Sequence, residues 1–417
     1  MNPLLLNTYD NVGGAAIATY RLHRGLRSIG VDSQLMVMHK GKGDSTVIGP
    51  EPQSRVQRAI TYWYARGDAK ITNKCRAAGN RYFSPARCSD SLAQRVASIN
   101  PDLVHLFWVN SGFMKIETLS QFKKPIIWTL HDMWPFTGGC HYDDECGRFR
   151  QSCGSCPILD SVSDHDLSRQ IWKRKQQSWS NVPIVVVGTS HWLAEMARAS
   201  TVFKDKRIEV IPNGLDTNKY KSLDKRAARD AYGLPQDKNL ILFSAMGGTL
   251  DKRKGGHLLV PALKRIAQAG WDERAELVII AAAAPDTPPD LGMKTHYIGQ
   301  LHDEISQVLL YSAADVTVAP SMQENLSNTV MESLSCGTPV VAFNIGGMPD
   351  MIDHQASGYL ARAFEPDDLA AGIVWVLEDK TRHAMLSQQA RKTVEDRYSL
   401  QTVAQRYLAL YQDVLNG

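Results

Sequence analysis

Short apolar runs that do not alternate with polar residues recur along almost the whole 417-residue chain. Residues 103–108, 126–130 and 184–187 are rich in leucine and β-branched side chains, and helical patterns separate them. Continuous apolar runs of this length are typical of strands that are buried on both faces, as in parallel sheets. Parallel strands need crossover connections, which are usually helices. The sequence therefore predicts an α/β protein built on parallel sheets.

Two series of such strands follow one another. The first comprises residues 4–7, 34–38, 103–108, 126–130 and 184–187, and the second comprises residues 240–244, 277–281, 296–298, 316–319 and 340–343. A Pro-Asn-Gly turn within residues 211–216 separates them. We predict one Rossmann-like domain over residues 1–212, another over 213–395, and a C-terminal helix over 396–417. Because ligands bind outside the carboxyl ends of parallel strands, the two domains are expected to face a shared cleft.

Composition excludes several classes of protein. Hydrophobic residues make up 43% of the chain and charged residues 22%, the balance of an ordinary globular protein. The longest apolar run, residues 277–284, is far shorter than the ~20 residues of a membrane-spanning helix. The N-terminus lacks the basic start of a secretion signal, so a cytoplasmic location is expected. No nucleic-acid partner is expected.

One segment departs from the overall net charge of +4. Residues 55–87 hold eight Arg or Lys side chains against the single acid Asp68, together with five aromatic residues. Basic and aromatic side chains together are typical of a peripheral contact with a membrane surface, which here would be the inner face of the membrane. The same composition also fits a solvated basic helix with its aromatic side chains packed inward.

The strongest local pattern places two glutamates, Glu324 and Glu332, on either side of a predicted helix start. Ser327 or Asn328 can cap this helix, and its free N–H groups and positive dipole end suit a diphosphate. Glu324, on the preceding loop, can hold sugar hydroxyls, and Glu332 can accept hydrogen bonds from a ribose diol. Without further motifs, the pattern would describe only a capped helix with two solvated acids.

Further motifs accompany this pattern in a fixed order. They are Gly13-Gly14, IPNGLD at 211–216, CGTPVVAFNIGG at 336–347 and SGYLA at 357–361. Together they resemble the retaining glycosyltransferases of family 4, which have the GT-B architecture. The resemblance implies that the C-terminal helix over 396–417 packs back toward the first domain. HDMWPFTGGCHY at 131–142 and TSHWLAEMA at 189–197 are similar to the branch that builds bacterial exopolysaccharides, including colanic-acid and cyanobacterial heterocyst envelope-polysaccharide glycosyltransferases.

The resemblance implies a role for several residues around the donor. Lys254 would bind the donor phosphates and neutralise the leaving diphosphate. The family usually has an arginine six residues earlier, where this chain has Gly248, so Arg253 or Lys252 would supply the second cation. Residues that would contact the nucleotide or its sugar through the loop and helix start are Glu324, Asn325, Leu326, Ser327, Asn328 and Glu332.

Other implied site residues come from the two predicted sheets. His131, at the end of a predicted strand, would approach the donor sugar, with Asp132 orienting its imidazole. Gly13 and Gly14 would let the backbone approach the diphosphate or the acceptor. The backbone of Ile298 would contact the base. His131, Lys254 and Glu324 are thus the expected catalytic residues.

The activity that the resemblance implies is a metal-independent, retaining hexose transfer. The donor would be a nucleotide-diphosphate sugar, with UDP-glucose preferred, and the acceptor a saccharide or lipid-linked saccharide in surface-polysaccharide biosynthesis. No Asp-x-Asp clamp like that of the other large transferase architecture is recognised, so no catalytic Mg²⁺ is expected. The alternatives are a nucleotide-sugar or polysaccharide-binding protein without turnover, or an epimerase of the same fold.

Four of the seven cysteines cluster within 17 residues, at Cys140, Cys146, Cys153 and Cys156. Four thiols at this spacing can form a tetrahedral structural zinc site. They can equally be free or disulfide-forming thiols.

Overall fold

The chain folds into two units, which are described separately. The computed structural model describes residues 1–50, 63, 66–71, 73, 82–88, 90–244, 252–280, 287–301 and 303–417. Unit 1 comprises Met1–Gly214 with Gln401–Gly417, and unit 2 comprises Leu215–Leu400. The predicted boundaries were 212/213 and 395/396. The second boundary lies later because helix α12 (Lys380–Tyr398) continues to Tyr398 before the chain returns to unit 1.

Unit 1 is built on a seven-stranded sheet in the order β3-β2-β1-β4-β5-β6-β7, and all its neighbouring strands are parallel. The strands are β1 (Pro3–Tyr9), β2 (Gln34–His39), β3 (Val47–Ile48), β4 (Leu103–Leu106), β5 (Ile126–Leu130), β6 (Ile184–Gly188) and β7 (Arg207–Val210). Both faces are covered. Leu4 and Leu6 belong to one apolar cluster, whereas Leu5 belongs to the cluster on the opposite face. This explains the unalternating apolar runs of the sequence.

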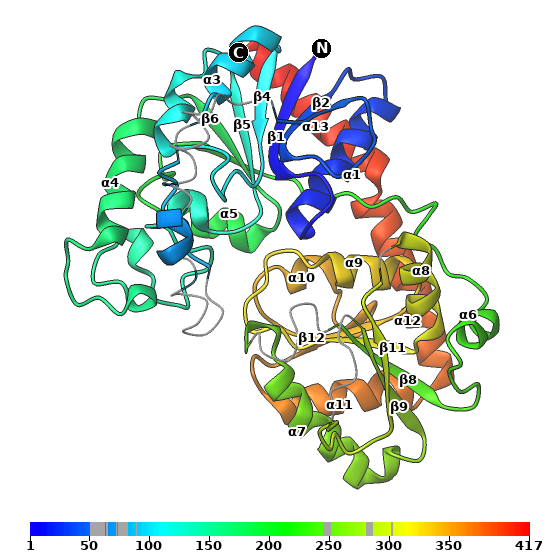
Figure 1. Cartoon of the computed structure of the whole chain (residues 1–417). Helices are drawn as coiled ribbons and strands as arrows, with labels where there is room; N and C mark the ends of the chain where they lie inside the picture. Colours follow the sequence, from blue (N-terminus) through cyan, green and yellow to red (C-terminus); the bar gives the residue numbers. More distant parts are fainter. Residues whose placement is uncertain are drawn as a thin grey trace. The chain divides into compact units, whose positions relative to one another are not determined.

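Helices from distant parts of the chain cover the two faces of this sheet. One cluster includes residues of α3 (Leu92–Ile99), α4 (Leu167–Trp179) and α5 (His191–Arg198). The opposite cluster includes residues of α1 (Gly14–Ser28) and of the C-terminal helix α13 (Leu400–Asn416). Within unit 1, α13 lies beside the sheet, and the two ends of the chain are close together (Figure 1).

Unit 2 repeats the architecture with a six-stranded sheet in the order β10-β9-β8-β11-β12-β13. The strands are β8 (Asn239–Ser244), β9 (Ala275–Ile280), β10 (Thr295–Gly299), β11 (Val316–Ala319), β12 (Val340–Phe343) and β13 (Gly358–Ala361), all parallel to their neighbours. The predicted fold class, two Rossmann-like units with parallel sheets, is therefore confirmed.

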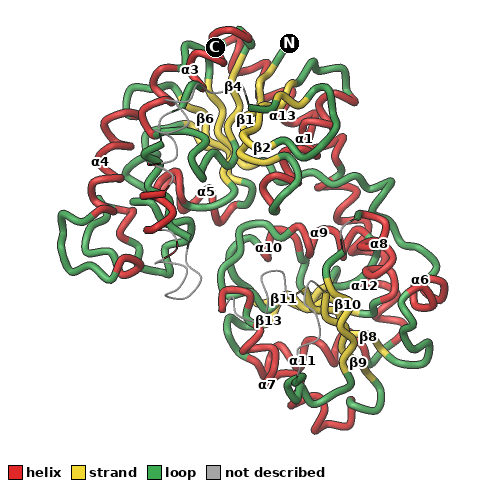
Figure 2. The backbone as a smooth tube through the Cα atoms, in the orientation of Figure 1, coloured by secondary structure: helices red, strands yellow, loops and turns green. Residues whose placement is uncertain are grey.

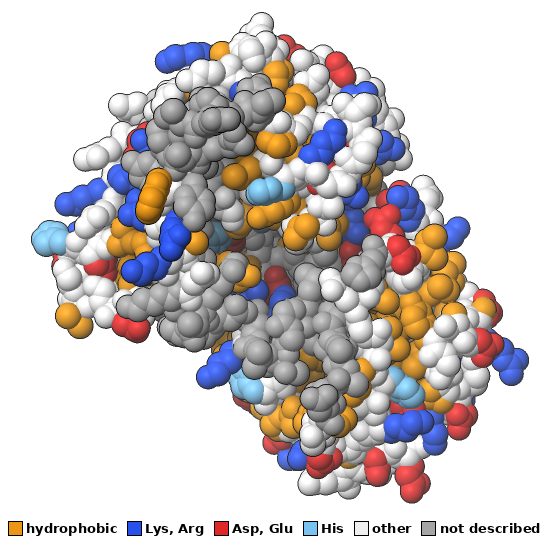
Figure 3. Space-filling view, in the orientation of Figure 1, with side chains coloured by type: hydrophobic (Ala, Val, Ile, Leu, Met, Phe, Trp, Pro, Cys, Tyr) orange, Lys and Arg blue, Asp and Glu red, His pale blue; other side chains and the backbone are white. Residues whose placement is uncertain are grey.

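Helices also cover both faces of the second sheet (Figure 2). Residues of α8 (Glu304–Ala313), α9 (Asn328–Ser335), α10 (Met348–Met351) and α12 form one apolar cluster, together with Ala228 of α6 (Lys225–Ala231). Residues of α7 (Gly256–Ile266) and α11 (Pro366–Leu377) form the opposite cluster. On the face drawn in Figure 3, described side chains of both charge signs are interspersed, in keeping with the small net charge of +4.

Candidate active site

The sheet of unit 2 has a topological switch point between β8 and β11. The strands on one side of β8 run β9, β10, whereas those on the other side run β11, β12, β13. Connections on either side of such a point leave toward opposite faces, which opens a crevice at the carboxyl ends of the strands. The segment after β8 leads to the short helix Lys252–Lys254, and the loop after β11 leads to α9.

Lys254 and Glu324 meet at this switch point. The Lys254 Nζ lies 2.7 Å from Glu324 Oε2. The glutamate is 8% exposed. Burial raises the pKa of Glu324, but the neighbouring cations Lys254 and Arg253 outweigh that effect and hold it below its ordinary value. The carboxylate is therefore ionised at neutral pH, and the two residues that the sequence predicts to be catalytic in unit 2 form an ion pair.

Backbone contacts hold the two loops of this pair together. The Met322 N–H donates to the Arg253 carbonyl at 2.8 Å. The Arg253 side chain donates to the Gln323 carbonyl at 3.5 Å. Gly255 follows directly with a φ of +71°, and a Cβ at this position would overlap the Pro320 carbonyl oxygen. Arg253 is thus held against the loop that carries Glu324, and its role as the second cation stays a prediction. Gly248 lies outside the described residues.

The start of α9 lies next along the same loop. Ser327 is the residue that caps it, since its side chain accepts from the Val330 N–H at 3.4 Å, and Asn328 is the first helical residue. Asn325 and Leu326 are buried in the preceding turn. The first N–H groups of α9 thus follow Glu324 closely in sequence, and Glu324 is paired with Lys254. This arrangement favours the binding of an anion.

Glu332 and Ile298 are less directly placed. Glu332 is buried, and its Oε2 accepts a hydrogen bond from the Tyr311 hydroxyl at 3.2 Å. One carboxylate oxygen of Glu332, the residue predicted to bind the ribose, is therefore already hydrogen-bonded within the protein. Ile298 is a half-buried residue of β10, and β9 separates β10 from β8. Neither role is tested by these contacts.

The remaining predicted residues belong to unit 1. Gly13 precedes α1 with a φ of +88°, and a Cβ there would meet no atom within 4 Å. Gly14 is the first residue of α1. His131 directly follows β5, and its ring stacks with Phe107 at a centroid distance of 5.9 Å. Burial lowers the pKa of His131 to about 4, so its imidazole is neutral at neutral pH.

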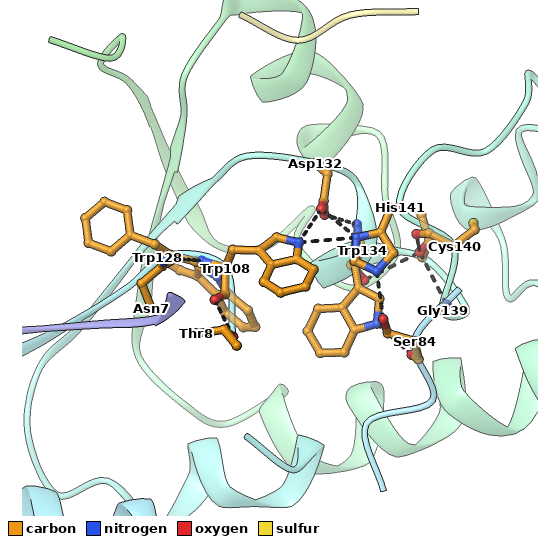
Figure 4. A network of polar contacts seen from close by, with 12 residues as sticks. Asn7, Thr8, Ser84, Trp108, Trp128, Asp132, Trp134, Gly139, Cys140 and His141 are labelled. Atoms are coloured by element: carbon orange, nitrogen blue, oxygen red, sulfur yellow. Dashed lines mark hydrogen bonds and ion pairs between the residues drawn. The ribbon is translucent and has the colours of Figure 1, made fainter. Parts of the chain in front are cut away.

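Asp132 has partners that the sequence did not predict. Its carboxylate accepts from His141 Nδ1 at 2.6 Å and from Trp108 Nε1 at 2.9 Å, and from the Trp134 N–H at 2.9 Å (Figure 4). The carboxylate thus orients His141, and the predicted orientation of His131 by Asp132 stays a prediction. Sequence reasoning missed His141, and its place in HDMWPFTGGCHY was the only available signal.

An Asp-x-Asp pattern is present after all, at Asp164 and Asp166, and sequence reading overlooked it. Asp166 caps α4 by accepting from the Ser168 N–H at 2.9 Å. Asp164 pairs with Arg169 at 2.5 Å. Both carboxylates therefore have structural partners.

The cysteine cluster shows no metal geometry. Cys140, Cys146, Cys153 and Cys156 all lie within the described part of the chain, in which no three His, Cys, Asp or Glu side chains are arranged to hold a metal ion. All four are free thiols, and burial raises the pKa of each. The prediction of a zinc site is therefore not supported. Cys140 and Cys156 are buried in the apolar core, where protonated thiols act as small hydrophobic side chains, whereas Cys146 and Cys153 are half-buried.

The basic segment at 55–87 lies largely outside the described residues. Of its described members, Trp63 is 70% exposed and Arg87 pairs with Asp68 at 2.8 Å. Within the described residues, no helix combines the length and apolar character needed to cross a membrane. Peripheral membrane contact remains a prediction.

Comparison with known protein families gives two matches that together span most of the chain. Residues 12–219 match the family described as Glycosyltransferase Family 4. Residues 224–393 match the family described as Glycosyl transferases group 1. The two matches meet between residues 219 and 224, a few residues after the passage from unit 1 to unit 2 at Gly214–Leu215.

Among curated relatives, a D-inositol 3-phosphate glycosyltransferase of Corynebacterium aurimucosum is 23% identical over 431 residues, covering 100% of this chain and 94% of the relative. A protein of the same description from Thermobispora bispora is 28% identical over 225 residues, covering 50% of this chain and 51% of that relative. With the second relative, the chain matches about half of the other protein's length.

Two solved structures are similar along their whole length. Sucrose-phosphate synthase from Thermosynechococcus elongatus has a TM-score of 0.69 at 18% identity, covering 100% of this chain and 99% of that one. HepE of Anabaena, solved in complex with UDP-glucose, has a TM-score of 0.65 at 18% identity, covering 99% of this chain and 100% of that one. At these identities the likeness shows the fold.

Proposed function

This chain belongs to the glycosyltransferases with the GT-B fold, and on that premise we propose that it transfers a hexose, preferably from UDP-glucose, to a saccharide or lipid-linked saccharide during surface-polysaccharide assembly. The reaction proposed is retaining and independent of metal. It follows the family pattern carried by the ordered motifs of the sequence.

The Lys254–Glu324 pair at the switch point of unit 2 is the observation that supports the donor site. Its two charges have the chemistry that a nucleotide sugar requires, a cation for phosphate and a carboxylate for sugar hydroxyls. Binding of a diphosphate would exchange one anionic partner of Lys254 for another, which would release Glu324 toward the sugar. The start of α9 offers further N–H groups to the same anion.

In the proposed reaction, the bond between the anomeric carbon and the diphosphate oxygen breaks and charge develops on the diphosphate. Lys254, Arg253 and the N–H groups of α9 would stabilise that charge. The leaving diphosphate would take the proton of the acceptor hydroxyl, and that hydroxyl oxygen would bond to the anomeric carbon from the same face. Transfer then needs neither a carboxylate nucleophile nor a metal ion.

Structural relatives support the choice of donor and pathway class. HepE was solved with UDP and with UDP-glucose, and another relative of the same fold, WaaG, is a glycosyltransferase involved in lipopolysaccharide biosynthesis. These descriptions concern those proteins, and they guide which donor to test first.

The test is release of UDP from UDP-glucose by the purified full-length chain. We expect slow release of UDP by the wild type. Lys254→Ala and Glu324→Gln should each lower this rate by roughly 10²-fold or more, because each removes a charge that acts in the transition state. Unchanged circular dichroism would show that both variants still fold. Wild-type rates in both variants would overturn the assigned donor site, and binding of UDP-glucose without any release would favour a binding protein.

A second acceptor is favoured by the full-length match to a D-inositol 3-phosphate glycosyltransferase. The same assay with D-inositol 3-phosphate added would show faster UDP release and a new glycoside if that compound is the acceptor. Proton NMR of the anomeric centre in any product would also decide whether configuration is retained.

A further inference from the structure

Two neighbouring strands of unit 1 present polar and aromatic side chains to the face that α13 covers. His105 lies on β4 and Thr129 on β5, and successive side chains of a strand alternate between the two faces of a sheet. Phe107 and His131 stand two residues further along, just past the ends of these strands, so they continue the same face. In agreement, Phe107 belongs to the apolar cluster that includes α13.

Two tyrosines of α13 bond to the first residues of this row. Tyr407 and Tyr411 stand four residues apart, so they lie on one side of the helix. The Tyr411 hydroxyl is 2.6 Å from His105 Nδ1, and the Tyr407 hydroxyl is 2.9 Å from Thr129 Oγ1. Thr129 Oγ1 is in turn 2.7 Å from His105 Nε2. The four side chains form one hydrogen-bonded network, and each residue is at most 2% exposed.

This network fixes the orientation of the His105 ring. Burial lowers the pKa of His105 well below its ordinary value, so the imidazole is neutral, with one nitrogen that donates and one that accepts. Each nitrogen has a hydroxyl partner, and a hydroxyl can take either role. Because both partners are buried, the ring cannot rotate without leaving a polar group unpaired, which is costly. His105 is therefore a fixed ring against which the next side chain of the row packs.

Phe107 connects this fixed ring to His131. The Phe107 ring centroid is 4.1 Å from that of His105, at an interplanar angle of 35°, and 5.9 Å from that of His131, at 27°. The Phe107 backbone is held as well, since its N–H donates to the Leu6 carbonyl and its carbonyl accepts from Trp128 Nε1, both at 3.0 Å. Phe107 is 4% exposed, whereas His131 is half-buried. The row of rings therefore ends on His131, at the edge where parallel sheets bind ligands.

We propose that two hydroxyls of α13, those of Tyr407 and Tyr411, position the imidazole of His131. The intermediates are the His105 ring, which the hydroxyls hold, and the Phe107 ring, which packs between the two imidazoles. This inference rests on the proposed function in that His131 would approach the donor sugar. It extends that function to the C-terminal helix, because a change in α13 should alter the reaction without touching a substrate.

The first test reads His131 directly, by NMR of the imidazole signals of the full-length protein labelled with ¹⁵N-histidine. The variant His131→Gln assigns its signals. We expect Tyr411→Phe, which removes one hydroxyl of the network, to shift the ring signals of His131 as well as those of His105. Tyr20→Phe is the matched control, since that hydroxyl bonds to Asp44 elsewhere in unit 1, and it should leave His131 unchanged. Signals of His131 that stay in place in Tyr411→Phe would overturn the proposal.

A second variant tests the connecting ring. Phe107→Leu removes the ring that packs between the two imidazoles, so adding Tyr411→Phe to it should no longer shift the signals of His131. Phe113→Leu controls for lost packing, because Phe113 is similarly buried, at 5% exposed, but belongs to the cluster on the opposite face of the sheet. An undiminished shift in the double variant would show that Phe107 does not connect α13 to His131. If Phe107→Leu does not fold, Tyr411→Phe alone decides the proposal.

Release of UDP from UDP-glucose gives the functional readout. Tyr411→Phe and Phe107→Leu should each lower kcat roughly tenfold, because a misplaced imidazole serves the transition state poorly. The affinity for UDP, measured by calorimetry, should not change, because the proposed donor site lies in unit 2. Wild-type kcat in both variants would overturn the role of this row in the reaction. A wild type that releases no UDP would contradict the proposed function instead, and the NMR shifts would still decide whether α13 positions His131.

Discussion

Lys175 is the side chain whose position is least expected for its chemistry. It is fully buried on α4, and its ammonium donates to the carbonyls of Trp134 and Thr137 while lying 3.9 Å from the centre of the Trp134 ring. Burial lowers the pKa of Lys175 to about 7. Lys175 thus connects α4 to the loop that carries His141. Its hydrogen bonds fix the geometry of this loop, although the charge is costly to bury.

This burial makes stability depend on pH. Because the folded pKa of about 7 is below the unfolded value near 10.5, the unfolded chain binds more protons between these values. The Lys175 contribution is therefore most favourable above the unfolded pKa and is lost as pH falls toward 7. In urea titrations, the unfolding free energy of the wild type should rise between pH 7 and 10 through this contribution. We expect Lys175→Met to abolish the part of the rise that Lys175 contributes. Parallel pH profiles for the two proteins would contradict the assignment.

At the residue scale, sequence reasoning located Lys254 and Glu324 but not their pairing, and it did not predict that Asp132 bonds to His141. Asp132 is hydrogen-bonded to Trp108 and His141, and His141 to Ser84. Ser84, Trp108 and His141 come from three separate segments, and no local periodicity links such residues. Lys175 did leave a signal. It stands four residues after Ile171 and four before Trp179, both buried, so the helical period marks position 175 as interior.

At the element scale, the strands that sequence reasoning missed are β3, β7 and β13, and each ends its sheet. An edge strand has a neighbour on one side only and needs no continuous apolar run. β3 has two residues and β7 begins with an exposed arginine, so neither resembles the central strands.

Gly255 is the backbone position on which the donor loops depend. It adopts a left-handed φ of +71°, and a Cβ there would overlap the Pro320 carbonyl oxygen. Gly233 adopts a similar φ of +61° but a Cβ would meet no atom within 4 Å. We expect Gly233→Ala to cost only about 1 kcal/mol of unfolding free energy, from backbone strain.

Gly255→Ala should cost more and should also slow UDP release, because the displaced loop carries Lys254 away from Glu324. Thermal unfolding and the UDP-release assay on both variants make the comparison. Equal effects of the two substitutions would show that the close approach to Pro320 does not matter.

At the scale of the whole molecule, α13 completes unit 1 from the far end of the sequence. The Tyr407 hydroxyl bonds to Thr129 at 2.9 Å and the Tyr411 hydroxyl bonds to His105 at 2.6 Å, both inside the apolar core. Sequence reasoning predicted this return of the chain, although only through the resemblance to the family.

Deleting residues 401–417 should therefore destabilise unit 1 while leaving unit 2 folded. We expect amide hydrogen exchange, read by mass spectrometry, to accelerate in β1, β4 and β5 but not in β8 and β11. Exchange that accelerates equally in both units would show that they unfold together. A single melting temperature would not separate these outcomes, because two units need not unfold as one.

The two crossings of the chain, at Gly214–Leu215 and at Leu400–Gln401, also set an order of events during synthesis. Unit 2 is uninterrupted, so every residue it needs has been translated before α13 is. Unit 1 begins first but can close its core only after α13 has emerged. Until then, the sheet face around Leu5 and Leu103 is uncovered where α13 will lie, and a nascent chain stalled at that stage would be a natural client for chaperones.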